Sequence, residues 1–194
     1  MKSWTGEYGD KYTEKWVLEP DELDKLWVRM VGQKRSDIIT EFLGQPHGYI
    51  LELGCNCGNQ LRMLKHLGAP KCALVGLDIN KRAVRVANSR GYNALHWSLQ
   101  TVPFNSEVFD LVMTCGVLCH VNPRDFPMIT LELGRLSPQT IFCTEYCDGK
   151  EWDGFRHGVF TEESVLPTGY EVVKTKRYDT GDGSAMIAVR MEKL

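Results

Sequence analysis

The central part of the chain alternates short apolar runs with segments of helical periodicity, and this order limits the possible folds more than any other feature of the sequence. The apolar runs, which we predict to be strands, are residues 49–53, 72–77, 92–97, 109–114 and 140–145. The helical segments are residues 59–67, 81–90 and about 123–136. Strands that alternate with helices favour a parallel sheet with helices on both faces.

The C-terminal part departs from this alternation. Residues 170–178 and 185–192 each alternate apolar and polar side chains, as half-buried strands do. Between them, residues 180–184 read Thr-Gly-Asp-Gly-Ser, a composition typical of a hairpin turn. We therefore predict an α/β, Rossmann-like fold with a seven-stranded, mostly parallel sheet that ends in an antiparallel C-terminal hairpin.

An aromatic stripe marks the beginning of the chain. Trp4, Tyr8, Tyr12 and Trp16 recur at every fourth position, which places them along one face of a helix. This face either packs into the core or closes as a lid over a ligand. A lid would set Tyr12 and Trp16 against a cofactor and Tyr8 against a substrate.

The length of 194 residues is that of one domain, so we predict a single domain over residues 1–194. Its N-terminal lid segment is expected at residues 1–45, with helices at about 20–31 and 36–43. The cofactor-binding core is expected at residues 46–194.

Composition excludes several classes of protein. The chain has 23 basic and 25 acidic residues, and the absence of a Lys/Arg block argues against a nucleic-acid partner. No apolar run is long enough to cross a membrane, and the N-terminus lacks the apolar region of a secretion signal, so a cytoplasmic protein is expected. The seven cysteines are odd in number and form no C-x-x-C pair, which predicts reduced thiols and no metal.

The chemistry-bearing segment is residues 52–60, Glu-Leu-Gly-Cys-Asn-Cys-Gly-Asn-Gln, between the first strand and a helix. Glycines let backbone approach a ligand, and a helix N-terminus offers free N–H groups. Asp78 ends the next strand, where a carboxylate can accept both hydroxyls of a ribose. The pair predicts a nucleoside site. The segment lacks the three glycines of a nicotinamide-binding turn and the lysine of a phosphate-binding loop.

This segment resembles motif I of the class I S-adenosylmethionine-dependent methyltransferases, with Asn56 in place of the middle glycine. The resemblance implies S-adenosyl-L-methionine as cofactor, and Ser98 and Leu99 would lie against the adenine. Thr114, Cys115 and Gly116 would lie at the methionine end. The other residues that it implies as cofactor-binding are Glu52, Gly54, Cys55, Asn56, Gly58, Asn59, Gln60, Asp78 and Ile79.

A second resemblance covers most of the chain. Residues 109–127 (FDLVMTCGVLCHVNPRDFP) and the opening residues 4–14 are similar to the methylases associated with pseudaminic acid biosynthesis. Glu145 and Tyr146, followed by an aromatic and basic segment at residues 152–160, add to this similarity. It implies a methyltransferase, an enzyme of class EC 2.1.1, that acts on a small polar metabolite such as a sugar, a nucleotide sugar or a small acid.

His120 is the candidate general base, because an imidazole just beyond the fourth strand would lie near the methyl group. Glu145 and Tyr146 are further catalytic candidates. Arg156 and His157 are candidates to hold an anionic substrate by charge-assisted hydrogen bonds. For each of these residues a purely structural role is the competing interpretation.

The residues directly after the fourth strand narrow the acceptor class. Enzymes that methylate the amino groups of bases or glutamine carry Asn/Asp-Pro-Pro-aromatic there, whereas this chain has Thr-Cys-Gly-Val at residues 114–117. O-methylation of a small molecule is therefore favoured over a nucleic-acid or protein methyltransferase. A non-catalytic S-adenosylmethionine-binding partner subunit is another alternative, and a nicotinamide-dependent oxidoreductase is a third.

Overall fold

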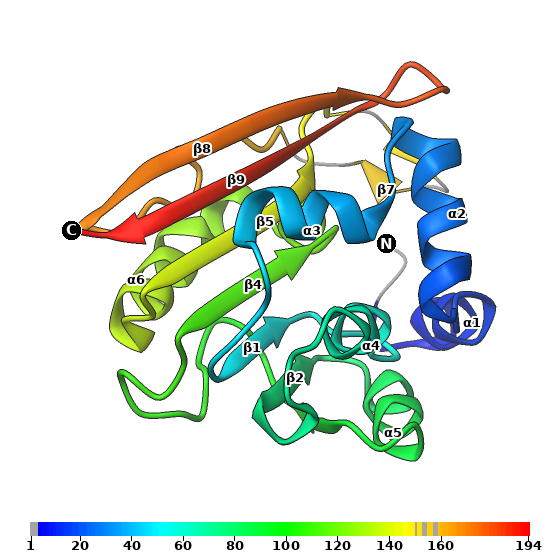
Figure 1. Cartoon of the computed structure of the whole chain (residues 1–194), viewed down its shortest axis with the longest axis horizontal. Coiled ribbons are helices and arrows are strands. Elements are labelled where there is room, and N and C mark those ends of the chain that lie inside the picture. Colours follow the sequence, from blue (N-terminus) through cyan, green and yellow to red (C-terminus); the bar gives the residue numbers. More distant parts are fainter. Residues whose placement is uncertain (1–3, 150, 153–154, 157–158) are drawn as a thin grey trace.

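The computed structural model describes residues 4–149, 151–152, 155–156 and 159–194, which form a seven-stranded sheet and a small hairpin (Figure 1). The strand order is β3-β2-β1-β4-β5-β9-β8. The first five of these strands are parallel, and β9 is antiparallel to both of its neighbours. The strands are β1 Ile50–Leu53, β2 Leu74–Asp78, β3 Asn93–His96, β4 Leu111–Cys115, β5 Thr140–Tyr146, β8 Tyr170–Asp179 and β9 Ala185–Lys193. The predicted fold class is confirmed.

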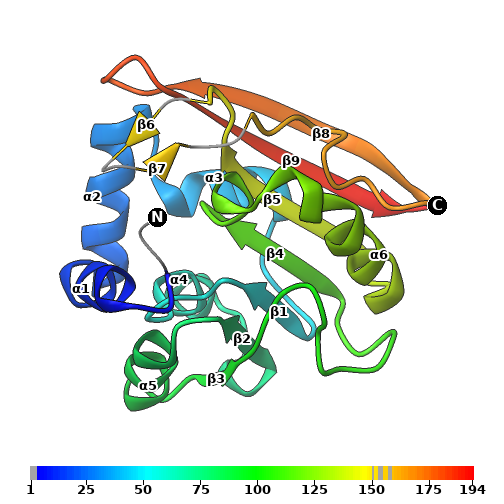
Figure 2. The same ribbon diagram turned by 180° about the vertical axis from the view of Figure 1, so that it is seen from behind.

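Helices cover both faces of the sheet (Figures 1 and 2). One face carries α2 (Pro20–Val31), α3 (Arg35–Leu43), α4 (Asn59–His66) and α5 (Lys81–Ser89), and the other carries α6 (Phe126–Leu136). Alternate side chains of β5 enter opposite cores. Phe142 of β5 packs against Phe42 of α3, with 5.3 Å between ring centroids, whereas its neighbours Ile141 and Cys143 enter the core beneath α6.

Element boundaries differ from the prediction where proline intervenes. Residues 123–136 do not form one helix, because a 3₁₀ turn at Pro123–Asp125 precedes α6. The strand predicted from residue 72 begins instead at Leu74, after a 3₁₀ turn, Lys71–Ala73, that follows Pro70. A proline has no N–H and a fixed φ, so it suits the start of a helical turn better than a ladder. The short hairpin of β6 (Glu151–Trp152) and β7 (Phe155–Arg156) was not predicted.

The aromatic stripe extends beyond its helix. Helix α1 comprises Glu7–Lys15, so Trp4 and Trp16 flank it instead of lying on it. Figure 1 shows α1 beside the lower end of α2 and near the N-terminus of the chain, on the side of the molecule toward which β1 and β4 point. The N-terminal segment therefore lies next to the carboxyl ends of the parallel strands, where ligands bind in open α/β sheets.

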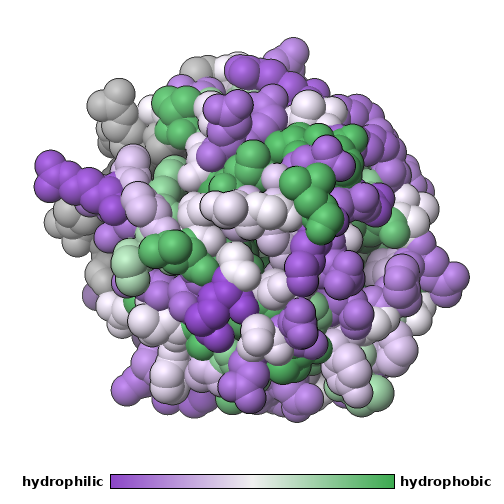
Figure 3. Space-filling view, turned by 90° about the vertical axis from the view of Figure 1, so that its left-hand side faces the viewer, coloured by the Kyte–Doolittle hydropathy of each residue, from purple (hydrophilic) through white to green (hydrophobic). Residues whose placement is uncertain are grey.

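The molecular surface seen from the left-hand side of Figure 1 is mainly hydrophilic, with apolar side chains in separate groups (Figure 3). Helix α6, which lies at that end, exposes Met128 and Leu131. Among the described residues, no helix has the length and apolar character needed to cross a membrane.

Candidate functional site: a cavity at the carboxyl edge of the sheet

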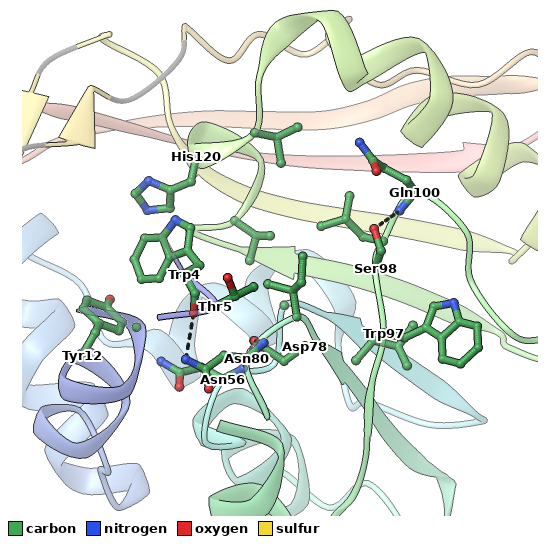
Figure 4. Close-up of a pocket in the computed structure, with 18 of the residues that line it drawn as sticks. Trp4, Thr5, Tyr12, Asn56, Asp78, Asn80, Trp97, Ser98, Gln100 and His120 are labelled. Atoms are coloured by element: carbon green, nitrogen blue, oxygen red, sulfur yellow. Dashed lines mark hydrogen bonds between the residues drawn. The ribbon is translucent and has the colours of Figure 1, made fainter. Parts of the chain in front are cut away.

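A cavity of about 740 Å³ opens at the carboxyl ends of β1, β2 and β4 (Figure 4). The N-terminal segment, the ends of these strands and the loops after β3 and β4 contribute its walls. Its predicted site residues are Tyr12, Gly54, Asn56, Asp78, Ile79, Ser98, Leu99, Cys115, Gly116 and His120. The structure thus brings together residues from four predicted strand ends and from the aromatic stripe.

The turn after β1 has an unusual backbone. Gly54, Asn56 and Gly58 all have positive φ, at 74°, 45° and 79°. This left-handed region suits glycine and, among other residues, asparagine, which explains how Asn56 replaces the middle glycine of the motif. A Cβ at Gly54 would lie 2.4 Å from a methyl group of Val117, so only glycine allows the loop after β4 to pack here.

Asp78 lines the cavity at the end of β2. One carboxylate oxygen accepts the backbone N–H of Asn56 at 2.8 Å, and the other accepts that of Asn80 at 2.7 Å. Burial raises the pKa of Asp78, and these two hydrogen bonds lower it. Asn80, not Asp78, caps helix α5, because its side chain accepts the N–H groups of Arg82 and Ala83. Asp78 therefore retains its remaining lone pairs for a ligand in the cavity.

Glu52 lies beneath the turn instead of in the cavity. It is buried in β1, and burial raises its pKa well above the usual range, while the Arg35 guanidinium lowers it. Arg35 is fully buried and donates to Gln60 at 2.8 Å and to Thr144 at 3.0 Å. Its guanidinium also lies over the Trp27 ring, 4.7 Å from the centroid. The predicted residues Glu52 and Gln60 thus belong to a buried polar group that supports the turn.

Five further predicted residues support the site from outside the cavity. Cys55, Gly58 and Asn59 belong to the turn and the start of α4, Thr114 is buried in β4, and Trp16 joins α1 to α2. Asn59 donates to the backbone oxygen of Trp16 at 2.6 Å and accepts the N–H of Leu18 at 3.1 Å. The side chain of Asn59 thereby holds the end of the N-terminal segment.

Glu145 is fully buried in β5 and does not line the cavity. Its carboxylate accepts the backbone N–H groups of Val117 at 2.8 Å and Cys119 at 3.2 Å. These residues belong to the loop and 3₁₀ turn (Leu118–His120) that carry His120. Burial raises the pKa of Glu145 to about 7, although hydrogen bonds from this loop lower it. Glu145 therefore holds the loop that carries the candidate base.

Glu145 makes the stability of the protein depend on pH. Because its folded-state pKa lies above the usual 4.5, its contribution favours the folded state at low pH and is lost as the pH rises through about 7. We expect the free energy of unfolding of the wild type, measured with urea, to fall by up to about 3 kcal/mol more than that of Glu145→Gln as the pH is raised from 5 to 8. A difference that stays constant with pH would contradict this assignment.

His120 and Trp4 face each other at one end of the cavity (Figure 4). Their ring centroids are 4.7 Å apart, and the Trp4 ring also contacts Tyr8 and Tyr12. Tyr8 therefore contributes to the aromatic wall through Trp4. Trp97, Ser98 and Gln100 lie on the opposite side of the cavity.

Tyr146 and Arg156 are not among the described residues that line the cavity. Tyr146 ends β5 and packs partly against the core beneath α2 and α3. The backbone of Arg156 pairs with Glu151 in the β6–β7 hairpin. His157 lies outside the described residues.

Several lining residues were not predicted. Those from the N-terminal segment and the strand ends are Thr5, Gly9, Thr13, Leu77 and Asn80, and those from the later loops are Gln100, Val117, Val121, Asn122 and Asp125. Position could have revealed three of them, because Leu77, Asn80 and Val117 immediately flank strand ends. Thr13 lies in the opening segment, residues 4–14, but no sequence signal relates it to Asn56, to whose side chain its hydroxyl donates at 2.7 Å.

A comparison with protein families matches the central part of the chain. Residues 50–137, which include the turn, Asp78 and His120, match the family described as a methyltransferase domain. A search of curated protein sequences gives no match.

Solved structures share the fold of the chain. The magnesium protoporphyrin IX methyltransferase of Synechocystis PCC 6803, crystallised with bound S-adenosylmethionine, is 15% identical, with a TM-score of 0.71 over 98% of this chain and 93% of that chain. A methyltransferase from Methanosarcina mazei is 20% identical, with a TM-score of 0.63 over 81% of this chain and 97% of that chain. The chain has the class I methyltransferase fold.

A third structure shows the range of acceptors on this fold. Geranyl diphosphate C-methyltransferase from Streptomyces coelicolor A3(2), crystallised with geranyl diphosphate and S-adenosylhomocysteine, is 12% identical, with a TM-score of 0.66 over 82% of this chain and 77% of that chain. The class I fold together with the methyltransferase domain supports an S-adenosylmethionine-dependent methyltransferase, and the domain implies S-adenosyl-L-methionine as cofactor. These comparisons do not define the acceptor.

Proposed function

We propose that the chain transfers a methyl group from S-adenosyl-L-methionine to a hydroxyl group of a small polar metabolite. One observation carries this proposal: a single cavity joins the nucleoside-type edge at Asp78 to His120. Methyl transfer requires the acceptor, the methyl group and the leaving sulfur to lie in line. A cavity that is continuous from the ribose-binding acid to an imidazole meets that requirement.

The residues that line the cavity suit this cofactor. Asp78 would hold the ribose hydroxyls, and Ile79, Ser98 and Leu99 would lie against the adenine. Gly116 has positive φ, and a Cβ there would enter open space, so its backbone borders the cavity directly and could approach the methionine end. When bound, the cofactor supplies a methyl group on a positively charged sulfur.

The chain's own contribution is to orient the acceptor and to move a proton. His120 would accept the proton that the acceptor hydroxyl loses as its oxygen bonds to the methyl carbon. Trp4 and Tyr12 would exclude water from that end of the cavity, which strengthens electrostatic interactions there. A carboxylate acceptor would need no base; for it, Arg156 and His157 would be the binding residues.

The acceptor class rests on the sequence. The similarity of residues 109–127 to the pseudaminic acid-associated methylases supports a sugar or nucleotide sugar. The loop after β4, which lacks the Asn/Asp-Pro-Pro-aromatic pattern, supports oxygen over an amino nitrogen. We propose that residues 1–194 form one domain that carries out this reaction.

Cofactor binding is tested by calorimetric titration with S-adenosylhomocysteine. We expect Asp78→Ala to weaken binding by about 10- to 100-fold, because hydrogen bonds to a charged group contribute roughly 1.5–3 kcal/mol. The affinity of Asp78→Asn, which keeps one acceptor oxygen, should lie between that of the wild type and that of Asp78→Ala. NAD serves as the control ligand, and its binding in place of S-adenosylhomocysteine would support the oxidoreductase alternative instead.

The acceptor class is tested with S-adenosylmethionine that carries a labelled methyl group. The purified protein is incubated with a cell extract separated into small molecules, proteins and nucleic acids. We expect the label in the small-molecule fraction. Alkaline treatment should release the label only from a methyl ester, so label that resists it indicates that a hydroxyl group was methylated. Label in protein or nucleic acid would overturn the proposed acceptor class. Cofactor binding without label in any fraction would support the non-catalytic partner subunit.

A further inference from the structure

Two asparagines join the carboxylate of Asp78 to the N-terminal segment. The backbone N–H groups of Asn56 and Asn80 donate to the two oxygens of Asp78, at 2.8 and 2.7 Å. Their side chains bond in the other direction: Asn56 accepts the hydroxyl of Thr13 at 2.7 Å, and Asn80 donates to the backbone oxygen of Trp4 at 2.8 Å. Asp78 is thus linked at both oxygens to the segment that covers the cavity.

We call residues 4–16 the strap. Five of its residues line the cavity: Trp4, Thr5, Gly9, Tyr12 and Thr13. Thr13 is buried, with 1% of its surface exposed, and it lies in the last turn of α1, so its hydroxyl fixes the C-terminal end of this helix. Gly9 lets the strap fold back on itself, because a Cβ there would lie 2.0 Å from the Trp4 carbonyl oxygen.

We propose that Asn56 is a positioning residue that couples cofactor binding at Asp78 to closure of the strap over the cavity. The proposal rests on the assignment of S-adenosylmethionine to this cavity. The geometry explains why the turn has asparagine where the family motif has glycine. The backbone at φ 45° accepts either residue, but only asparagine supplies an oxygen to Thr13.

The coupling follows from linkage. A ligand that bonds to Asp78 favours the arrangement in which Asn56 and Asn80 hold that carboxylate in place. The same arrangement presents the Asn56 side chain to Thr13, so closure of the strap and occupation of the cavity stabilise each other. If closure of the strap strengthens cofactor binding by a given free energy, the bound cofactor must stabilise the closed strap by the same free energy.

The Asn56–Thr13 pair allows a clean test, whereas Asn80 also caps α5. Asn56→Gly keeps the left-handed backbone and the N–H to Asp78 while it removes the side chain. Thr13→Val removes only the hydroxyl, and Thr13→Ser retains it. Thr40→Val is the matched control, because Thr40 is exposed on α3 and bonds only to its own helix, at Ser36.

Two measurements are made on the full chain. Hydrogen exchange of residues 10–16 without ligand reports strap opening, and calorimetry reports S-adenosylhomocysteine affinity. We expect Asn56→Gly and Thr13→Val each to raise exchange and to weaken affinity by roughly fivefold, the worth of one hydrogen bond. The double variant should be no worse than either single variant, and Thr13→Ser and Thr40→Val should match the wild type.

The outcomes separate this proposal from the cofactor assignment. If the wild type binds S-adenosylhomocysteine and the variants bind equally well, the coupling is overturned and the cofactor assignment stands. Effects that multiply in the double variant also overturn it, because the two side chains would then act independently. A wild type that does not bind S-adenosylhomocysteine overturns both.

Discussion

Replacement of Arg35 by methionine is expected to lower the free energy of unfolding by about 3–5 kcal/mol, because it removes two buried hydrogen bonds from a charged donor, each worth roughly 1.5–3 kcal/mol. Arg35 is fully buried and donates to Gln60 and Thr144. Without it, both partners lose a buried hydrogen bond and Glu52 loses the positive charge that lowers its pKa. Urea denaturation at pH 7 measures the loss.

The controls separate charge from packing. Arg29→Met removes an arginine from the exposed surface of α2 and should change stability by less than about 0.5 kcal/mol. Adding Glu52→Gln to Arg35→Met should change the loss little, because burial raises the pKa of Glu52 well above its usual range and favours its neutral form. A loss below about 1 kcal/mol for Arg35→Met would show that Arg35 does not stabilise the buried group.

The sheet was predictable because its signals are local. The parallel strands are apolar runs bounded by turns, and the C-terminal strands alternate and are separated by a turn of suitable composition. Because ligands bind at the carboxyl ends of parallel strands, the same pattern predicts that Gly54, Asp78 and Cys115 share one site. All three line the cavity.

The residues that support the site could not be predicted from the sequence, because their partners are distant along the chain. Arg35 and Thr144 are 109 positions apart, and no motif relates them. Glu145 was a catalytic candidate, and because β5 lies beside β4 its carboxylate faces the backbone of Val117 and Cys119. A strand pattern shows that a side chain faces inward and gives no indication of which loop it meets.

The strap illustrates the same limit at closer range. The spacing of its aromatic residues predicted a helix, and α1 confirms the central part of it. The side chains that attach the strap to the core are those of Thr13, Asn56 and Asn80. In a sequence, residues of these types are common at helix caps and on the surface, so they gave no sign of this role. The motif showed that Asn56 replaces a glycine, but it did not show that the Asn56 side chain bonds to Thr13.

Removal of the imidazole at position 120 is expected to lower kcat by roughly 10²–10⁴-fold, the usual contribution of a general base. His120→Ala should leave the affinity for S-adenosylhomocysteine nearly unchanged, because Asp78 and the turn after β1 lie elsewhere in the cavity. The rate is measured with the small-molecule fraction that accepts labelled methyl groups, at saturating cofactor. A fall in kcat with constant affinity identifies a group that acts in the transition state.

The His120 ring also packs 4.7 Å from the Trp4 ring, so loss of packing must be separated from loss of the base. His120→Phe keeps an aromatic ring against Trp4 and cannot take a proton. If His120 is the base, both variants lose kcat to a similar extent, while only His120→Ala disturbs the strap in hydrogen exchange. His66→Ala, on the exposed end of α4, should leave kcat unchanged. Full activity in His120→Phe would instead assign His120 to packing and favour an acceptor, such as a carboxylate, that needs no base.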